Sequence, residues 1–230
     1  MIRKHDCKRF YSVLYHTLAR IVFWFTLIVV IIYNICVFRI RILGKKNLRI
    51  QSKGAFLISN HVLYFDSAII AHIIAPRRVF FTALEETFLL YFIGTYIRYL
   101  GAFPVSNSMP YNIFISNIKK IFNNGNFIHF FPEGELSHLN LDINNFKNGV
   151  FFLAFKLNRP VIPVTIITKP RTSLSKGLNH FFCRVTVAIS KPVYPSQFKH
   201  STGKTRNRIK CMANYCRHIM MEEYKKNRNL

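Results

Sequence analysis

Residues 55–66, Ala-Phe-Leu-Ile-Ser-Asn-His-Val-Leu-Tyr-Phe-Asp, contain the change from strand to helix around which the fold is predicted. The run Ala55–Ser59 predicts a buried strand, and the Ser-Ala-Ile-Ile-Ala run that follows Asp66 predicts a helix. The turn between them carries His61 and Asp66, in a chain that has only nine acidic residues. This turn is therefore a candidate site for chemistry.

The side chains of His61 and Asp66 can meet only if the residues between them form a loop. On one continuous helix, five residues of about 100° each would place them about 140° apart. A loop would fold His61 back over the helix start, where the negative charge of Asp66 is favoured. A carboxylate bonded to one ring nitrogen would leave the other nitrogen as a base. The alternative is a structural histidine beside an aspartate that caps a helix.

Beyond this turn, apolar strand candidates alternate with helix candidates. Strands are predicted at residues 55–59, 79–83, 102–105, 127–131, 161–168 and 182–190. Helices are predicted between them at residues 66–75, 85–99, 111–123 and 147–157. This alternation predicts an α/β fold with a mostly parallel sheet flanked by helices. Pro163 interrupts one predicted strand and marks either a bulge or a sheet edge, because proline cannot donate to the ladder.

A second stretch that could take part in chemistry is Phe131–Ser137, Phe-Pro-Glu-Gly-Glu-Leu-Ser. An apolar strand runs here into a proline, the carboxylate of Glu133 and a glycine. Ligands of open α/β sheets bind at the carboxyl ends of strands, and Gly134 would let the backbone approach a substrate closely. The alternative for these residues alone is an ordinary Pro-Gly turn.

The N-terminal part of the chain predicts a membrane anchor. Residues 21–38 carry no charge and would span about 27 Å as a helix, close to the thickness of the hydrocarbon core. This helix could cross the bilayer, or dip in and return, or be a buried helix of a soluble domain. Basic residues on both sides give no orientation. We divide the chain into a basic N-terminus with an anchor helix (1–45), an α/β domain (46–200) and a basic C-terminal helix (201–230).

Composition narrows the class of partner. The 230 residues include 33 Lys and Arg, giving a formal net charge of +24, and half of the residues are hydrophobic. The charge predicts an anionic partner, and the apolar content favours an anionic membrane surface over nucleic acid. The five cysteines are scattered and odd in number, which predicts free thiols rather than a metal site or a disulfide framework.

Three sequence blocks together resemble the glycerophospholipid acyltransferase family. They are Asn-His-x4-Asp at residues 60–66, Phe-Pro-Glu-Gly with a serine three places on at residues 131–137, and Val-x-Pro-Val at residues 161–164. Each block is common by itself, but the three agree with the family in order and spacing over about residues 55–168. The N-terminal apolar helix is also usual in this family.

The resemblance implies the transfer of an acyl group to a lysolipid hydroxyl, with 1-acylglycerol-3-phosphate as the conventional acceptor. His61 would be the general base and Asp66 its orienting partner, while substrate binding would fall to Asn60, Glu133, Gly134 and Ser137. It implies no metal and no cofactor besides the co-substrate, an acyl-CoA or acyl-carrier-protein thioester. We expect a membrane protein whose active site faces the cytoplasm.

The chain departs from the family where an acceptor phosphate is thought to be held by arginine. Those places hold Leu136, after Glu135, and Asn107. His138 and Lys147 are possible substitutes, and weak discrimination for a terminal phosphate is expected. Alternative acceptors are another lysophospholipid, an aminolipid or a glycolipid. A further alternative is a catalytically inactive protein of the same fold that binds membranes or nucleic acid.

Overall fold

In the computed structural model, residues 13–49, 53–105, 110–136, 143–170, 178, 181–198 and 204–228 are described. One sheet of seven strands forms the centre, in the order β1-β7-β6-β2-β5-β3-β4. The strands are β1 (Arg41–Leu43), β2 (Phe56–Ser59), β3 (Val79–Leu84), β4 (Phe103–Val105), β5 (Phe127–Phe130), β6 (Val161–Lys169) and β7 (Arg184–Ile189).

The sheet is mostly parallel, which confirms the predicted fold class. Strand β2 pairs in parallel with β5 and β6, and β3 pairs in parallel with β5 and β4. Only the pairing of β6 with β7 is antiparallel. Because β2 and β5 are parallel neighbours, the loops that follow them begin at the same edge of the sheet. The two chemical stretches of the sequence are these two loops.

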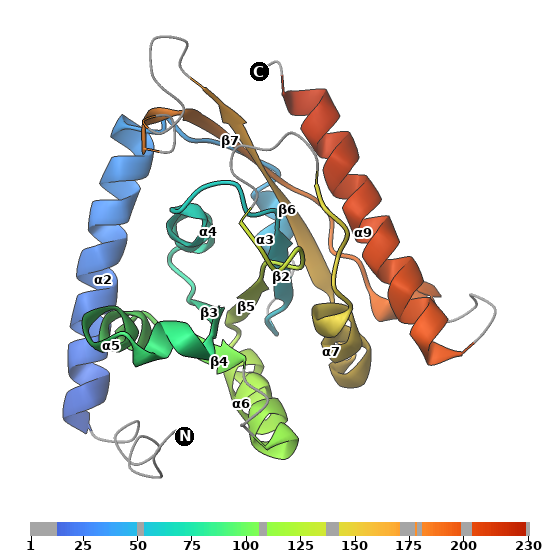
Figure 1. Cartoon of the computed structure of the whole chain (residues 1–230), viewed down its shortest axis with the longest axis horizontal. Helices are drawn as coiled ribbons and strands as arrows, with labels where there is room; N and C mark the ends of the chain where they lie inside the picture. Colours follow the sequence, from blue (N-terminus) through green and yellow to red (C-terminus); the bar gives the residue numbers. More distant parts are fainter. Residues whose placement is uncertain are drawn as a thin grey trace.

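Helices cover both faces of the sheet (Figure 1). They are α2 (Val13–Cys36), α3 (Lys46–Arg49), α4 (Asp66–Ile74), η1 (Glu85–Leu89), α5 (Tyr91–Tyr99), α6 (Tyr111–Asn123), α7 (Gly149–Leu157), η2 (Pro195–Phe198) and α9 (Thr205–Asn227). Leu57 of β2 packs into a core shared with α4, while Phe56 and Ile58 pack into a second core shared with α6, α7 and α9. The continuous apolar run of β2 is therefore explained by burial on both faces.

The structure differs from the predicted elements in several places; the predicted strand 182–190, for example, begins only at Arg184 because residues 181–182 are helical. The predicted helix 85–99 is broken into η1 and α5, because Leu90 is extended and Gly94 packs against the backbone of Phe88. The apolar helix α2 begins earlier than predicted and ends at Cys36, so that Phe38 lies outside it and is buried in the core. Strand β1 was not predicted.

Pro163 lies in an interior strand, so of the two predicted alternatives the edge is excluded and the bulge is present. Pro163 pairs with Ile58 of β2, and its carbonyl accepts a hydrogen bond from Ser190 just past the end of β7. The pair Val164–Ile189 belongs to the regular ladder. In that register Val161, three residues before Val164, would face the residue three places after Ile189, but it bridges Val193, which is four places after it. This one-residue offset lies beside the proline, where no N–H is available for the ladder.

Candidate active site

The loop between β2 and α4 brings the predicted pair together. His61 Nδ1 lies 2.8 Å from Asp66 Oδ2, and Asp66 is the first residue of α4. The residues between them are not helical, as the pairing requires. Since the carboxylate accepts the Nδ1 proton, Nε2 is the nitrogen left to act as a base. The His61 side chain is 24% exposed, so a substrate can reach it.

Asp66 is held more tightly than a surface cap would be. Its Oδ2 also accepts hydrogen bonds from the backbone N–H groups of Val62 (2.7 Å) and Leu63 (2.9 Å). Burial raises the pKa of Asp66, while the hydrogen bonds from His61 and from the two backbone groups favour the charged form and oppose this rise. The three bonds fix the loop around one oxygen and set the orientation of the histidine ring.

An aromatic ring supports the other side of the histidine. The rings of His61 and Phe131 are stacked, with centroids 3.9 Å apart and planes at 15°. Phe131 in turn meets the edge of His129 of β5, with centroids 4.5 Å apart. The imidazole of His61 is therefore positioned by a hydrogen bond at one edge and by an aromatic ring on one face.

Asn60 anchors the start of the loop to the neighbouring strand. Its Nδ2 donates to the carbonyl of Ile166 in β6, and its Oδ1 accepts from the N–H of Ile166, both at 2.8 Å. Asn60 is buried, and these two bonds use both ends of its amide. These contacts hold the start of the loop against β6. The predicted contact of Asn60 with substrate stays a prediction.

Glu133 connects the second chemical stretch to the first. Its Oε1 accepts from the backbone N–H of His61 (3.2 Å), and its Oε2 accepts from the backbone N–H of Asn144 (3.0 Å). The side chain is buried. It therefore ties the histidine loop to the segment that leads into α7, a partnership that its motif did not indicate.

The C-terminal helix also reaches this network. Arg217 of α9 donates from Nε to the carbonyls of Ile143 (2.9 Å) and Asn144 (3.0 Å). Asn144 thus receives support from α9 at its carbonyl and bonds to Glu133 through its N–H. No local sequence pattern could have indicated Arg217, because it lies 73 positions from Asn144.

Gly134 allows a close approach, here by the side chain of Lys147, and the predicted approach of a substrate stays a prediction. Its φ of +79° is in the region that favours glycine, and a Cβ atom there would collide with the side chain of Lys147. Leu136, which stands where the family has an arginine, is half-buried. Ser137, His138 and Asn107 lie outside the described residues.

A second histidine is buried behind the site. His129 Nε2 lies 2.9 Å from Ser59 Oγ at the end of β2. Burial, assisted by the nearby His61, lowers the pKa of His129 to about 3, so this ring is neutral at physiological pH. Its place within an apolar strand gave no signal in the sequence.

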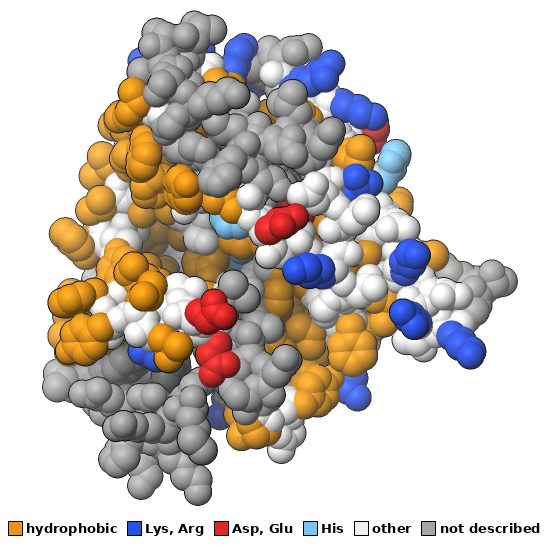
Figure 2. Space-filling model, viewed as in Figure 1, with side chains coloured by type: hydrophobic (Ala, Val, Ile, Leu, Met, Phe, Trp, Pro, Cys, Tyr) orange, Lys and Arg blue, Asp and Glu red, His pale blue; other side chains and the backbone are white. Residues whose placement is uncertain are grey.

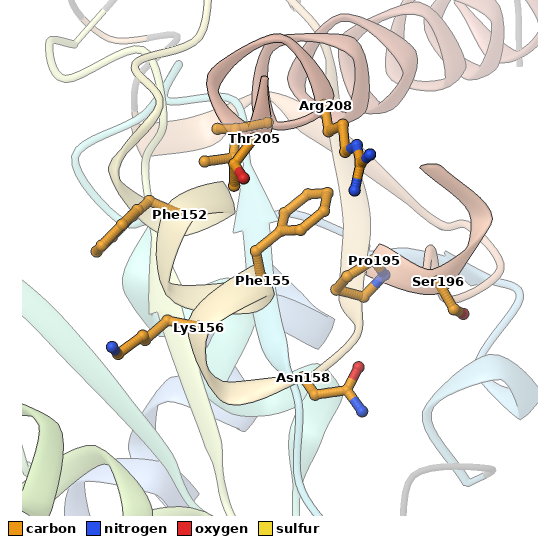
Figure 3. A pocket seen from close by; sticks show the side chains of 9 residues that line it. Phe152, Phe155, Lys156, Asn158, Pro195, Ser196, Thr205 and Arg208 are labelled. Carbon is orange, nitrogen blue, oxygen red and sulfur yellow. The ribbon is translucent and has the colours of Figure 1, made fainter. Parts of the chain in front are cut away.

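Other surface features lie apart from these loops. A groove of about 400 Å³ between α7, η2 and α9 is shown in Figure 3, and none of its lining residues belongs to the predicted site. The lining residues are Phe152, Phe155, Lys156, Asn158, Pro195, Ser196, Thr205, Arg208 and Ile209. In the part of the chain that the structure describes, no group of three His, Cys, Asp or Glu side chains is placed to hold a metal ion.

Comparison with known sequences points to one family. A family model described as Acyltransferase matches residues 39–167, which include both strand-end loops. Two chloroplastic proteins named 1-acyl-sn-glycerol-3-phosphate acyltransferase are each 28% identical to the chain, one from Brassica napus over 171 residues and one from Arabidopsis thaliana over 178 residues. These alignments cover 72% and 75% of the chain but 48% of each plant protein. The chain therefore spans about half the length of these curated relatives.

A bacterial relative and a solved structure extend the comparison. A 1-acyl-sn-glycerol-3-phosphate acyltransferase from Bacillus subtilis is 22% identical over 169 residues, covering 73% of this chain and 80% of that protein. The crystal structure of the 1-acyl-sn-glycerophosphate (LPA) acyltransferase PlsC from Thermotoga maritima superposes with a TM-score of 0.59 at 23% identity. That match covers 81% of this chain and 71% of the other, and it shows that the two share a fold.

Proposed function

The chain belongs to the acyltransferase family, and from this premise we propose that it moves a fatty acyl group from a thioester to the hydroxyl of a lysolipid. The proposed acceptor is 1-acylglycerol-3-phosphate, the acceptor in the names of its relatives. The observation that carries the proposal is the 2.8 Å contact of His61 Nδ1 with the buried carboxylate of Asp66. The proposed donor is acyl-CoA or acyl-carrier protein, each of which presents the same thioester.

In the proposed reaction His61 acts as the general base. Its Nε2 removes the proton of the acceptor hydroxyl as the oxygen attacks the thioester carbonyl. The new ester bond forms, the C–S bond breaks, and the proton passes from His61 to the departing thiolate. Asp66 keeps the ring in the required tautomer and stabilises the imidazolium in between. No acyl-enzyme is needed, because the acceptor itself is the nucleophile.

The surrounding contacts give the base a fixed position. Proton transfer and attack require the reacting atoms to be held within a narrow range of distance and angle. The bonds of Asn60 to Ile166 and of Glu133 to the N–H of His61 hold the loop from two neighbouring strands. Within the proposal, these two residues position the base rather than bind the acceptor.

The proposed site of action is a membrane surface. Helix α2 contains the segment Thr17–Cys36, the one helix among the described residues that is long and apolar enough to cross a membrane by length and composition. Only 22% of its most apolar window is buried, which disfavours the alternative of a soluble core helix. Figure 2 shows apolar side chains gathered along the flank formed by α2 and over α5. The exposed ones on α2 are Leu18, Ile21, Trp24, Phe25, Ile28, Val29, Ile32 and Ile35.

The contacts of α2 favour a helix that lies along the membrane over one that crosses it. The guanidinium of Arg78 lies 4.5 Å from the ring centroid of Phe23, and Asn34 Nδ2 lies 3.3 Å from His72 Nδ1. These two points are eleven residues apart, about 16 Å along the helix axis. The α/β domain thus lies against one side of α2 over this length. If α2 crossed the membrane, polar groups of the domain would enter the hydrocarbon core. One apolar stripe remains for lipid.

The activity is tested by direct assay. Purified protein in detergent is incubated with labelled acyl-CoA or acyl-carrier protein and a panel of lysolipids, and the products are identified by mass spectrometry. We expect an acylated lysolipid from the wild type and none from a His61→Ala variant that unfolds at the same temperature. Absence of product with every donor and acceptor, or full activity of His61→Ala, would overturn the proposal.

Membrane association is tested with single substitutions. Burying one Phe side chain contributes about 1.5–3 kcal/mol, so Phe25→Gln should weaken partitioning into lipid vesicles about tenfold or more. Phe152→Gln on α7 is the matched control, because Phe152 is also exposed but lies away from the stripe. Flotation with anionic vesicles measures both. Equal losses in the two variants would remove α2 as the lipid-facing element.

A further inference from the structure

Lys147 occupies an unusual place beside the candidate site. Its side chain passes over Gly134, and its Nζ, Cε and Cδ atoms are the three atoms nearest to the position that a Cβ of Gly134 would take. Gly134 follows Glu133, whose carboxylate binds the backbone N–H of His61. The ammonium group therefore lies beside Gly134, the residue that follows Glu133. Only a glycine at position 134 leaves room for it there.

The backbone that carries Lys147 is fixed. The N–H of Lys147 donates to the carbonyl of Pro132 at 2.8 Å. Three residues earlier, Asn144 is bound to Glu133 through its N–H and to Arg217 through its carbonyl. Because this backbone is already ordered, ligand binding would cost the lysine side-chain freedom but no further ordering of its backbone.

The charge of Lys147 has no anionic partner within the described part of the protein. Lys147 is exposed, and among the described residues no carboxylate oxygen lies within 4.0 Å of its Nζ. Residues 143–221 contain no Asp or Glu at all. Glu133 is buried, and its two oxygens accept hydrogen bonds from the backbone N–H groups of His61 and Asn144. A cation placed this way beside a catalytic base is suited to an anionic substrate group.

We infer that Lys147 binds the phosphate of the acyl acceptor. The inference rests on the proposed function and names the acceptor class as lysolipids with a terminal phosphomonoester. A phosphomonoester carries more negative charge than a phosphodiester, and a lysine contacts it as a point charge. The weak discrimination expected from Leu136 and Asn107 is thus replaced by a preference that depends on one lysine.

The test compares acceptors in two variants of Lys147. We expect wild-type kcat/KM to be at least about tenfold higher for lysophosphatidate than for a monoacylglycerol of the same chain length, which is the size of one charge-assisted contact. Lys147→Met should remove this preference by lowering kcat/KM for lysophosphatidate alone. Lys147→Arg should retain most of it. Lys156→Met, an exposed lysine on α7 remote from both loops, is the matched control and should change neither acceptor.

Other outcomes would overturn the inference. If Lys147→Met lowers kcat/KM equally for both acceptors, or for neither, the lysine does not recognise the acceptor phosphate. Acyl-CoA also carries phosphates, so the same variants are assayed with acyl-pantetheine, a donor that lacks them. A loss that appears only with acyl-CoA would place the lysine on the donor and overturn the inference.

A binding measurement separates this inference from the proposed function. Labelled lysophosphatidate and labelled monoacylglycerol are bound to detergent-solubilised wild type, Lys147→Met and Lys156→Met, without any donor. Selective loss of lysophosphatidate binding in Lys147→Met would support the inference even if no acyl transfer were detected. Unchanged lysophosphatidate binding in that variant would contradict it even in an active enzyme.

Discussion

In the loop at residues 60–65, Asn60 and His61 bind partners within the protein, as does Asp66 at the loop's end. In the described parts of the loop that follows β5, residues 131–136 and 143–148, the charged side chains differ in direction. Glu133 points inward and binds two backbone N–H groups, while Lys147 lies exposed over Gly134. The two loops follow the parallel neighbours β2 and β5 and so meet at one edge of the sheet. The same edge therefore combines a rigid part with an open part.

Under the proposed function, this difference separates catalysis from substrate recognition. A base must be held within a fraction of an ångström, and the first loop supplies that through bonds to Ile166, Asp66 and Glu133. A phosphate contact depends mainly on charge and tolerates more variation. A residue of the second loop that faces solvent, such as Glu135, can thus vary while the proposed base remains in place. The following variants test this division.

The largest effect is expected at the centre of the rigid loop. Asp66→Asn keeps the shape of the side chain but removes the charge that stabilises the imidazolium. General-base catalysis is typically worth about 10²–10⁴-fold, and most of this should be lost from kcat. Thermal unfolding of the variant serves as the control for folding. A kcat within about tenfold of the wild type would contradict the assigned role of Asp66.

The next largest effect is expected where the two loops join. Glu133→Gln places an amide nitrogen against one of two backbone N–H donors, so one bond is lost and the His61 loop shifts. A shift of this kind should lower kcat about ten- to a hundredfold, with a smaller change in the acceptor KM. Glu135→Gln removes an exposed carboxylate from the same loop and is the control. If both variants behave alike, Glu133 does not position the base.

A smaller effect is expected from α9. Arg217→Met removes two hydrogen bonds to the carbonyls of Ile143 and Asn144, while the bond of Asn144 to Glu133 remains. We expect a loss of about 1–3 kcal/mol in the free energy of unfolding and a several-fold decrease in kcat. Arg206→Met, at an exposed position of the same helix, should show neither. Equal denaturant midpoints for the two variants would contradict the prediction.

The smallest effect at neutral pH concerns His129. Because its pKa is lowered to about 3 in the folded protein, the unfolded chain binds a proton below about pH 6.5 that the folded chain does not. Stability is therefore fully present above about pH 6.5 and falls as the pH decreases, by at most about 1.4 kcal/mol per pH unit.

Denaturant unfolding at pH 7 and pH 5 measures this contribution. His129→Gln should lose about 2 kcal/mol less than the wild type between the two conditions. The raised pKa of Asp66 has the opposite effect on stability as the pH falls, and it does so in both proteins. This contribution therefore cancels when the variant is compared with the wild type. His218→Gln, at an exposed position, should behave as the wild type. Equal acid sensitivity in His129→Gln would show that His129 does not titrate as assigned.

Local sequence was enough to predict the elements that depend on local patterns. Helix α6 has the predicted bounds 111–123, because its apolar spacing is regular, and the strands were found from their continuous apolar runs. The His61–Asp66 contact followed from the geometry of a loop that joins a strand to a helix. Strand β1 was missed because it has three residues, begins with the charged Arg41 and depends on pairing with β7.

Features that depend on tertiary contacts could not be read from the sequence. Pro163 suggested an edge or a bulge, and only the neighbouring strands decide between them. Glu133 was identified from its motif, but its partner Asn144 and the support from Arg217 come from distant parts of the chain. The break at Leu90 depends on the packing of Gly94 against Phe88.

The position of Arg217 has a consequence for the order of assembly. Helix α9 follows all seven strands in the sequence, so it is synthesised after the sheet and after both loops. Chains fold during synthesis from the N-terminal side, and the sheet with its histidine loop can form while α9 is still missing. The last support of the Asn144 segment then arrives only when α9 packs against β6 and α7. Under the proposed function, a nascent chain would hold His61 and Lys147 before Arg217 fixes the Asn144 segment, and full activity would be gained last.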